Sequence, residues 1–308
     1  MMKRNLNAIS WLCWATVLWI GVLEGRAAGG RIKVTTTVSM VTDLVRQVGG
    51  DRVEVEGLMG AGVDPHLYKA AASDVTKLRR ADVIFYNGLV LEGKMSDMLV
   101  KLAKVKKFVY ALSESVPVAQ LLNPPEFEGH HDPHIWFDVE LWSHCVDTVV
   151  RGLSAYSAAD SVYFQTQGRR VKTEMAALHK WAKARADELP EEKRILITSH
   201  DAYNYFGRAY GFQVVGLQGI STVTEAGLAD MAKLVDFIKA RGVKAIFVES
   251  SVSPAAIQRI SRDAGVKIGG ELFSDAMGTP GQMENGHDLG TYDGMIKHNL
   301  NTIVNALK

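Results

Sequence analysis

The sequence alternates short segments rich in β-branched residues with longer segments of helical periodicity, and it does so twice. The strand-like segments cover residues 32–38, 53–59, 83–87 and 108–112 in the first half, and 195–198, 214–217, 245–249 and 266–269 in the second. Such alternation is typical of parallel sheets whose strands are joined by crossover helices. We therefore expect an α/β protein of two lobes, each with a parallel four-stranded sheet and flanking helices.

A long amphipathic segment separates the two halves. Apolar residues recur on one helical face from Phe164 to Leu189, with charged residues largely elsewhere. The spacing predicts one rigid helix over Ala158–Glu188, far longer than the average helix of about 11 or 12 residues. A helical connection resists bending more than a Gly/Ser loop, so we expect small lobe movements. The predicted boundaries are a signal peptide at 1–28, an N-terminal lobe at 29–157, a linking helix at 158–189 and a C-terminal lobe at 190–308.

The first residues follow the pattern of an export signal. Lys3 and Arg4 precede the apolar run Ile9–Leu23, and the small-residue stretch Gly25–Ala28 follows. This order predicts a secretory signal that is cut after Ala27, and hence a periplasmic protein. A retained membrane tether is the alternative, although the run is short against the roughly 20 apolar residues of a full span.

Composition narrows the possible functions. The chain has 35 Lys and Arg against 34 Asp and Glu, so it offers no excess positive charge for nucleic acid. Its apolar and charged fractions match a globular protein, which we expect to be a monomer. After signal cleavage Cys145 is the remaining cysteine, so the fold has no internal disulfide.

The tripeptide Asp-Pro-His occurs twice, ending at His66 and at His134. Proline fixes its own φ and restrains the residue before it, so both histidines project from stiff turns. A metal ligand needs such a pre-set direction. His66 follows the second predicted strand, and His134 precedes a helix that starts near Val139, so both lie where loops gather at a sheet edge.

The second half adds two ligand-type residues at the corresponding edge. His200 directly follows the segment Ile195–Thr198, and Asp275 lies beyond the last strand. Open α/β sheets bind ligands at the carboxyl ends of their strands, so four such residues are expected to converge, two from each lobe. Three imidazoles and one carboxylate suit Zn²⁺, Mn²⁺ or Fe²⁺ and differ from the oxygen shells of Ca²⁺ and Mg²⁺.

Other polar residues have ordinary alternatives. A single histidine is more often a hydrogen-bonded structural residue than a ligand, and Asp before Pro is a common turn opener. Glu249 ends a strand at the ligand edge, where it either orients a histidine N–H or is a simple polar terminus. His130 and His131 fit a solvated loop, although they could pass metal toward His134. His287 stays open.

The segments around these residues, together with Gly216–Ser221 and Phe247–Ser251, resemble the zinc- and manganese-binding proteins of ABC importers, particularly the TroA-like members. The resemblance covers nearly the whole mature chain. It implies two α/β lobes, a rigid linking helix and one metal ion at their interface, held by His66, His134, His200 and Asp275. Manganese-specific members often have Glu at the position of His200, and zinc members often have a long histidine-rich loop before His134. This chain has neither feature, so the resemblance leaves Zn²⁺ and Mn²⁺ open.

Two functions of different classes follow from this set of residues. A solute-binding protein would capture the metal in a cleft between the lobes and deliver it to an ABC permease and its ATPase, without catalysing a reaction. A secreted zinc-dependent hydrolase would keep an open position for water on the same ion. The chain has no His-Glu-x-x-His helix, which favours the binding protein.

Overall fold

The first half of the chain folds around one parallel sheet. The computed structural model describes residues 30–308, so the predicted signal at residues 1–28 lies outside the described residues. Four strands pair in the order β2-β1-β3-β4, all parallel. Their bounds are β1 (Ile32–Thr36), β2 (Val53–Gly57), β3 (Val83–Tyr86) and β4 (Val109–Ala111). Each predicted strand of this half is present, shortened by one or two residues.

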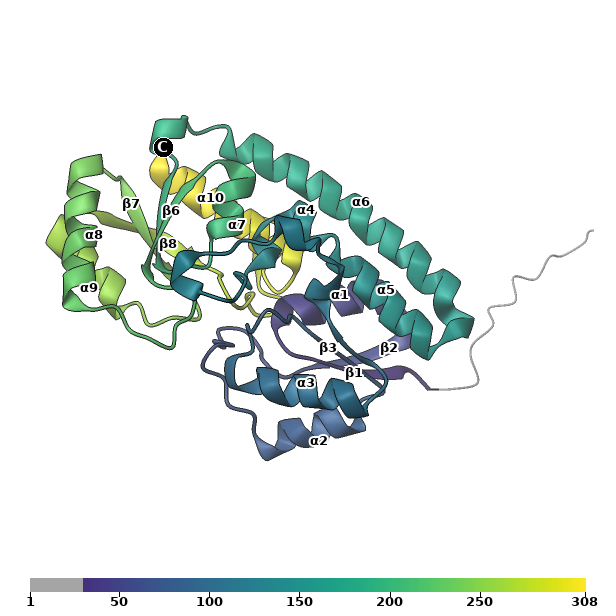
Figure 1. The fold of residues 1–308 in the computed structure, drawn as a ribbon. Helices are drawn as coiled ribbons and strands as arrows, with labels where there is room; N and C mark the ends of the chain where they lie inside the picture. The colour runs from purple at the N-terminus through teal and green to yellow at the C-terminus, as the bar shows by residue number, and fades with distance from the viewer. Residues whose placement is uncertain (1–29) are drawn as a thin grey trace, which may run out of the picture. The chain divides into compact units, whose positions relative to one another are not determined.

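Helices cover both faces of this sheet. On one face lie α2 (Ala72–Arg80) and α3 (Ser96–Val105), and on the other lie α1 (Ser39–Gly49) and α5 (Cys145–Tyr156) (Figure 1). The short helix α4 (Val139–Trp142) precedes α5, and the Asp138 carboxylate caps it by accepting the N–H groups of Glu140 and Leu141. The turn that bears His134 is thereby held against the start of α4.

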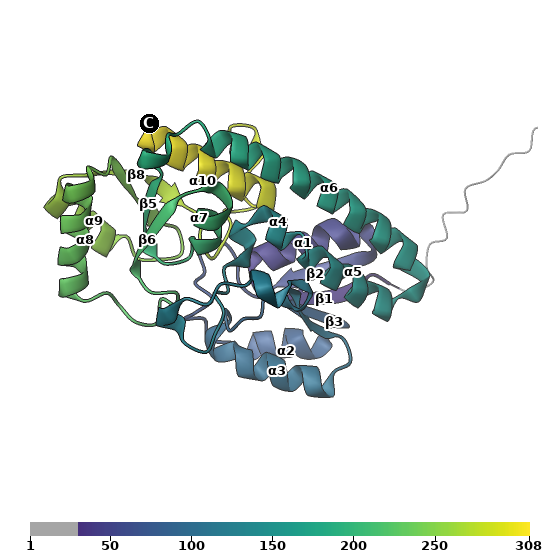
Figure 2. The ribbon, with the colours of Figure 1, turned by 45° about the horizontal axis from the view of Figure 1, so that its top comes forward.

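The predicted long helix is present. One 3₁₀ turn (Ala158–Asp160) leads into α6 (Ser161–Ala186), and α6 runs past both halves of the fold (Figures 1 and 2). A Cβ atom on Gly168 would lie 2.6 Å from the Val150 side chain, so glycine allows α6 to pack closely on α5. Among residues 30–308, no helix is both long and apolar enough to cross a bilayer.

The second half repeats the alternation with a difference in its sheet. Its elements are β5 (Ile195–His200), α7 (Asn204–Tyr210), β6 (Gln213–Gln218), α8 (Leu228–Arg241), β7 (Ala245–Glu249), α9 (Ala255–Ala264), β8 (Lys267–Leu272), the hairpin β9–β10 (Met283–Glu284, His287–Asp288) and α10 (Tyr292–Leu307). The four main strands pair as two parallel ladders, β5–β6 and β7–β8, with β5 packed beside β7. The β7–β8 register shifts between Ile246 and Phe247, where Gly269 of β8 is the extra residue, so this ladder is locally irregular.

Two apolar clusters hold these elements together. The larger one runs from β1 and α1 through α5, α6 and α10 to Phe247 and Leu272, so it joins both halves. The smaller one lies between the strands of the second half and helices α8 and α9, and includes Leu234, Ile238 and Ile257. The expected α/β class and linking helix are confirmed. The lobe boundaries at 157/158 and 189/190 stay a prediction.

Candidate metal centre

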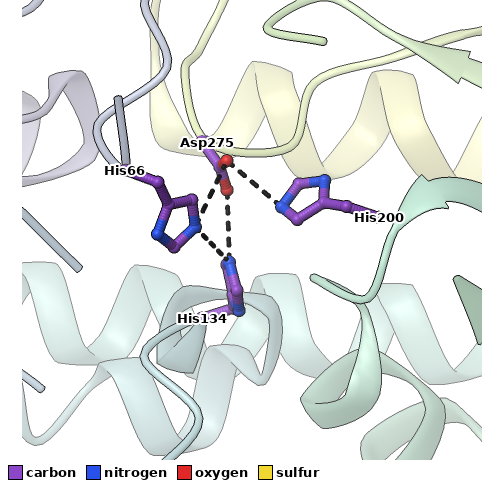
Figure 3. A group of neighbouring side chains, drawn as sticks. All are labelled: His66, His134, His200 and Asp275. Carbon is purple, nitrogen blue, oxygen red and sulfur yellow. Dashed lines mark hydrogen bonds and ion pairs between the residues drawn. The ribbon is translucent and has the colours of Figure 1, made fainter. Parts of the chain in front are cut away.

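Four ligand-type residues far apart in the chain meet at the carboxyl edge of the strands (Figure 3). His66 lies in the loop after β2, His134 lies directly before a 3₁₀ turn that leads to α4, His200 is the last residue of β5, and Asp275 lies three residues beyond β8. All four are buried, with at most 3% of their surface exposed. Each half of the fold contributes two of them.

The facing atoms are close to one another. Nε2 of His134 lies 3.3 Å from Nε2 of His66 and 3.4 Å from Oδ1 of Asp275. Oδ2 of Asp275 lies 3.2 Å from Nε2 of His200 and 3.8 Å from Nε2 of His66. One donor atom from each residue falls within 4.8 Å of all the others. This spacing is compatible with a single cation among three nitrogens and one carboxylate.

Several of these atoms have no hydrogen-bond partner. Nε2 of His200 and both carboxylate oxygens of Asp275 are buried and make no hydrogen bond within the described residues. Buried polar atoms without partners cost free energy, so native proteins rarely tolerate three of them pointing at one spot. A bound cation would satisfy all three at once.

Two carboxylates orient two of the imidazoles. Oδ1 of Asp132 lies 2.7 Å from Nδ1 of His134, and Oε2 of Glu249 lies 2.6 Å from Nδ1 of His200. Each carboxylate also accepts the backbone N–H of its histidine. Because a carboxylate only accepts, Nδ1 must carry the proton in both rings, which leaves Nε2 free to face the cation.

The neighbouring carboxylates give the three histidines different pKa values. Burial lowers the pKa of His66 to about 3, so its ring is neutral near pH 7. Burial also opposes charge on His134, but Asp132 and Asp275 together outweigh it and raise the pKa to about 9. Glu249 and Asp275 likewise outweigh burial and raise the pKa of His200 well above its usual value. The pKa of Asp275 is held well below its usual range because His200 and His134 outweigh its own burial.

Two glycines let the backbone approach the site closely. A Cβ atom on Gly93 would lie 2.5 Å from the carbonyl oxygen of His66, and Gly93 has a φ of +46°. A Cβ atom on Gly216 in β6 would lie 2.6 Å from the backbone nitrogen of Asp201. Side chains at either position would therefore displace the backbone that carries His66 or His200.

Hydrogen bonds cross between the two halves around the site. Oδ2 of Asp64 accepts the Thr222 hydroxyl at 2.6 Å, and the indole N–H of Trp136 donates to the carbonyl oxygen of Ser274 at 3.1 Å. The Asn204 amide donates to Oδ2 of Asp132 at 3.2 Å. The turns of the first half are thus fastened to loops of the second.

Other histidines lie outside this group. His298 on α10 contacts Glu284 and the carbonyl oxygen of Glu271, and His287 lies 3.8 Å from Asp293. Asp132 was not singled out by the sequence pattern, which treats it as a turn opener. Its position two residues before a histidine was the available signal, but Asp64 has the same position and does not contact its ring.

A family model described as the periplasmic component A of the zinc-uptake complex matches residues 34–306. The chain belongs to this family. Its members are the binding components of metal importers, so the chain is a substrate-binding protein and not an enzyme, and the hydrolase alternative has no support. The resemblance drawn from the sequence is thereby confirmed.

Named relatives of this family member bind different metals. The chain is 44% identical to the zinc-binding protein TroA of Treponema pallidum, covering 95% of this chain and 97% of that protein. It is 43% identical to the manganese-binding lipoprotein MntA of Bacillus subtilis, covering 92% of each. The solved structure of periplasmic TroA from T. pallidum superposes with a TM-score of 0.85, at 44% identity over 90% of this chain and 99% of that one.

Proposed function

We propose that this protein captures one Zn²⁺ or Mn²⁺ ion outside the cytoplasm, through His66, His134, His200 and Asp275, and delivers it to an ABC permease. The convergence of the buried Asp275 carboxylate with three Nε2 atoms, with one donor atom of each residue within 4.8 Å of all the others, carries this proposal. Fe²⁺ fits the same donor set. Glu249 and Asp132 would act by holding two of the ligands in the binding tautomer.

The delivery step follows from where the donors lie. Two come from residues 29–157 and two from residues 190–308, which we propose to act as separate lobes on either side of the linking helix at 158–189. A cation bound by both lobes favours the closed arrangement through its differential affinity. The loaded monomer in the periplasm would thereby differ in shape from the empty one, and the permease with its ATPase would respond to that difference.

Metal content tests the proposal directly. The processed chain should bind one equivalent of Zn²⁺ by elemental analysis after dialysis, and His200→Ala should reduce its affinity by more than 100-fold. His130→Ala is the matched control because it removes an imidazole from an exposed loop position. Equal zinc content in the wild-type chain and in His200→Ala would remove His200 from the ligand set.

The physiological metal needs a separate measurement. Affinity for such sites rises from Mn²⁺ to Zn²⁺, so purified protein should prefer zinc whichever metal the cell imports. Native cells are grown with limiting zinc or with limiting manganese, and the protein is isolated from their envelope. Elemental analysis of that protein shows which of the two metals it contains. Cells that lack the protein should lose import of its cargo, so loss of zinc import alone or of manganese import alone would identify the metal.

A further inference from the structure

Positive charge is concentrated in one segment of the first half. Residues 69–107 contain nine Lys and Arg against four Asp and Glu, whereas the other 269 residues contain 26 against 30. Two of the four acids, Asp74 and Glu92, are buried. The surface of this segment is therefore more positive than its composition indicates.

A single lysine brings the basic ends of two helices together. Nζ of Lys106, just after α3, donates to the carbonyl oxygens of Leu78, Arg79 and Ala81 at 3.1, 3.2 and 2.6 Å. These carbonyls lie at the end of α2, so the C-terminal ends of α2 and α3 are joined. The two helices lie side by side in both views (Figures 1 and 2).

The resulting surface, which we call the α2–α3 face, has one exposed acid, Asp97, among exposed cations and apolar side chains: Arg79, Arg80, Lys101, Lys104, Lys107, Val75, Val100 and Val105. Lys77 of α2 pairs with Glu56, but the five exposed cations make no ion pair within residues 30–308. Val105 is 81% exposed and Val100 is 47% exposed. Nζ of Lys107 lies 5.2 Å from the centre of the Phe108 ring, and the other four cations and the valine tips face solvent.

We propose that the α2–α3 face docks on the headgroup surface of an anionic lipid bilayer. Clustered Lys and Arg are attracted to anionic headgroups, and apolar tips between them can enter the boundary with the acyl chains. Four cavities of residues 30–308 are lined by residues outside α2 and α3, and a fluid array of phosphates fits an exposed helical face of this kind better than a ligand of fixed shape does. Docking would keep an importer's binding protein next to the membrane that contains its permease.

Vesicle binding tests this inference. The processed chain is mixed with vesicles of phosphatidylcholine alone, or of phosphatidylcholine with an equal part of phosphatidylglycerol, and sedimented at low ionic strength. We expect binding to the anionic vesicles only, and its loss at about 0.5 M salt, where charges are screened within a few ångströms. Lys101→Glu with Lys104→Glu should weaken this binding at least tenfold.

Two further variants separate the charge of the face from total charge. Lys239→Glu with Lys244→Glu makes the same charge change at exposed positions of the second half and should bind vesicles as the wild-type chain does. Val105→Ser keeps every charge and should weaken binding a few-fold. The inference would be overturned if both double variants lost vesicle binding equally, or if the chain bound vesicles of phosphatidylcholine alone. It would also be overturned if the chain bound immobilised polyglutamate but no vesicles. None of these results bears on the metal site, so zinc content serves as an independent check of folding.

Discussion

The two Asp-Pro-His turns have the same three residues and use their carboxylates differently. In the second turn, Asp132 is buried and contacts both the backbone N–H and the ring Nδ1 of His134. In the first turn, Asp64 accepts the backbone N–H of His66 and then bonds Thr222 in the other half of the molecule. Both carboxylates therefore reach the other half, Asp132 through Asn204 and Asp64 through Thr222, but only Asp132 also orients the imidazole of its own turn.

The two turns also differ in the charge of their imidazole rings. The ring of His134 is fixed in direction and, without metal, positively charged at neutral pH, with a pKa of about 9. The ring of His66 is neutral, with a pKa of about 3 because of its burial. In the proposed function, a cation entering the site would displace a proton from the second turn and none from the first. The comparison predicts that matched substitutions in the two turns have unequal effects.

Replacing the two aspartates by asparagine should give the largest contrast. Asp132→Asn removes the charge that orients His134, and losing such a partner typically lowers metal affinity about 10–100-fold. Asp64 does not contact the His66 ring, so Asp64→Asn should lower metal affinity by less than tenfold. Competition of each variant with a zinc chelator measures both constants. Equal losses would contradict the division of roles between the turns.

Proton release should follow the same division. His134 and His200 have raised pKa values and are protonated near pH 7 in the empty protein, whereas His66 is not. Because imidazole must be neutral to bind metal, loading should release about two protons. Affinity should then rise by about a hundredfold per pH unit near pH 7, and fall as the solution is acidified.

Calorimetry in buffers with different protonation enthalpies counts these protons. In Asp132→Asn the pKa of His134 should fall, because one of the two carboxylates that oppose its desolvation is gone, and up to one proton fewer should be released. Asp64→Asn should release as many as the wild-type chain. Release of no protons by the wild-type chain would refute the assigned charge states.

Breaking the link from the first turn should have the smallest effect. Thr222→Val removes the 2.6 Å hydrogen bond to Asp64, which corresponds to about 0.5–1.5 kcal/mol. If that bond helps to hold the loaded state, metal should dissociate about two- to tenfold faster, with the association rate little changed. Thr222→Ser keeps the hydroxyl and should behave as the wild-type chain does. Stopped-flow mixing with excess chelator measures the rate, and equal rates for valine and serine would exclude this role.

Much of the architecture was readable from local patterns. The eight main strands and the long helix α6 fall where β-branched runs and a 3.6-residue period place them, because these patterns report burial on one face of a single element. The division of the second sheet into two ladders was not readable. The register shift between Ile246 and Phe247 was not readable either, because it arises between two paired strands and not within one.

The sequence by itself determined the donor types, their stiff turns and their places at strand ends. Only the tertiary structure decided that Asp132 faces its imidazole while Asp64 turns to Thr222, since the two tripeptides are identical. The direction of a side chain in a turn depends on what packs against it, and Asn204 and Thr222, which contact these carboxylates, lie 72 and 158 residues further along the chain. Contacts at such separations leave no periodic pattern in the sequence, so their outcome is set when the two halves meet.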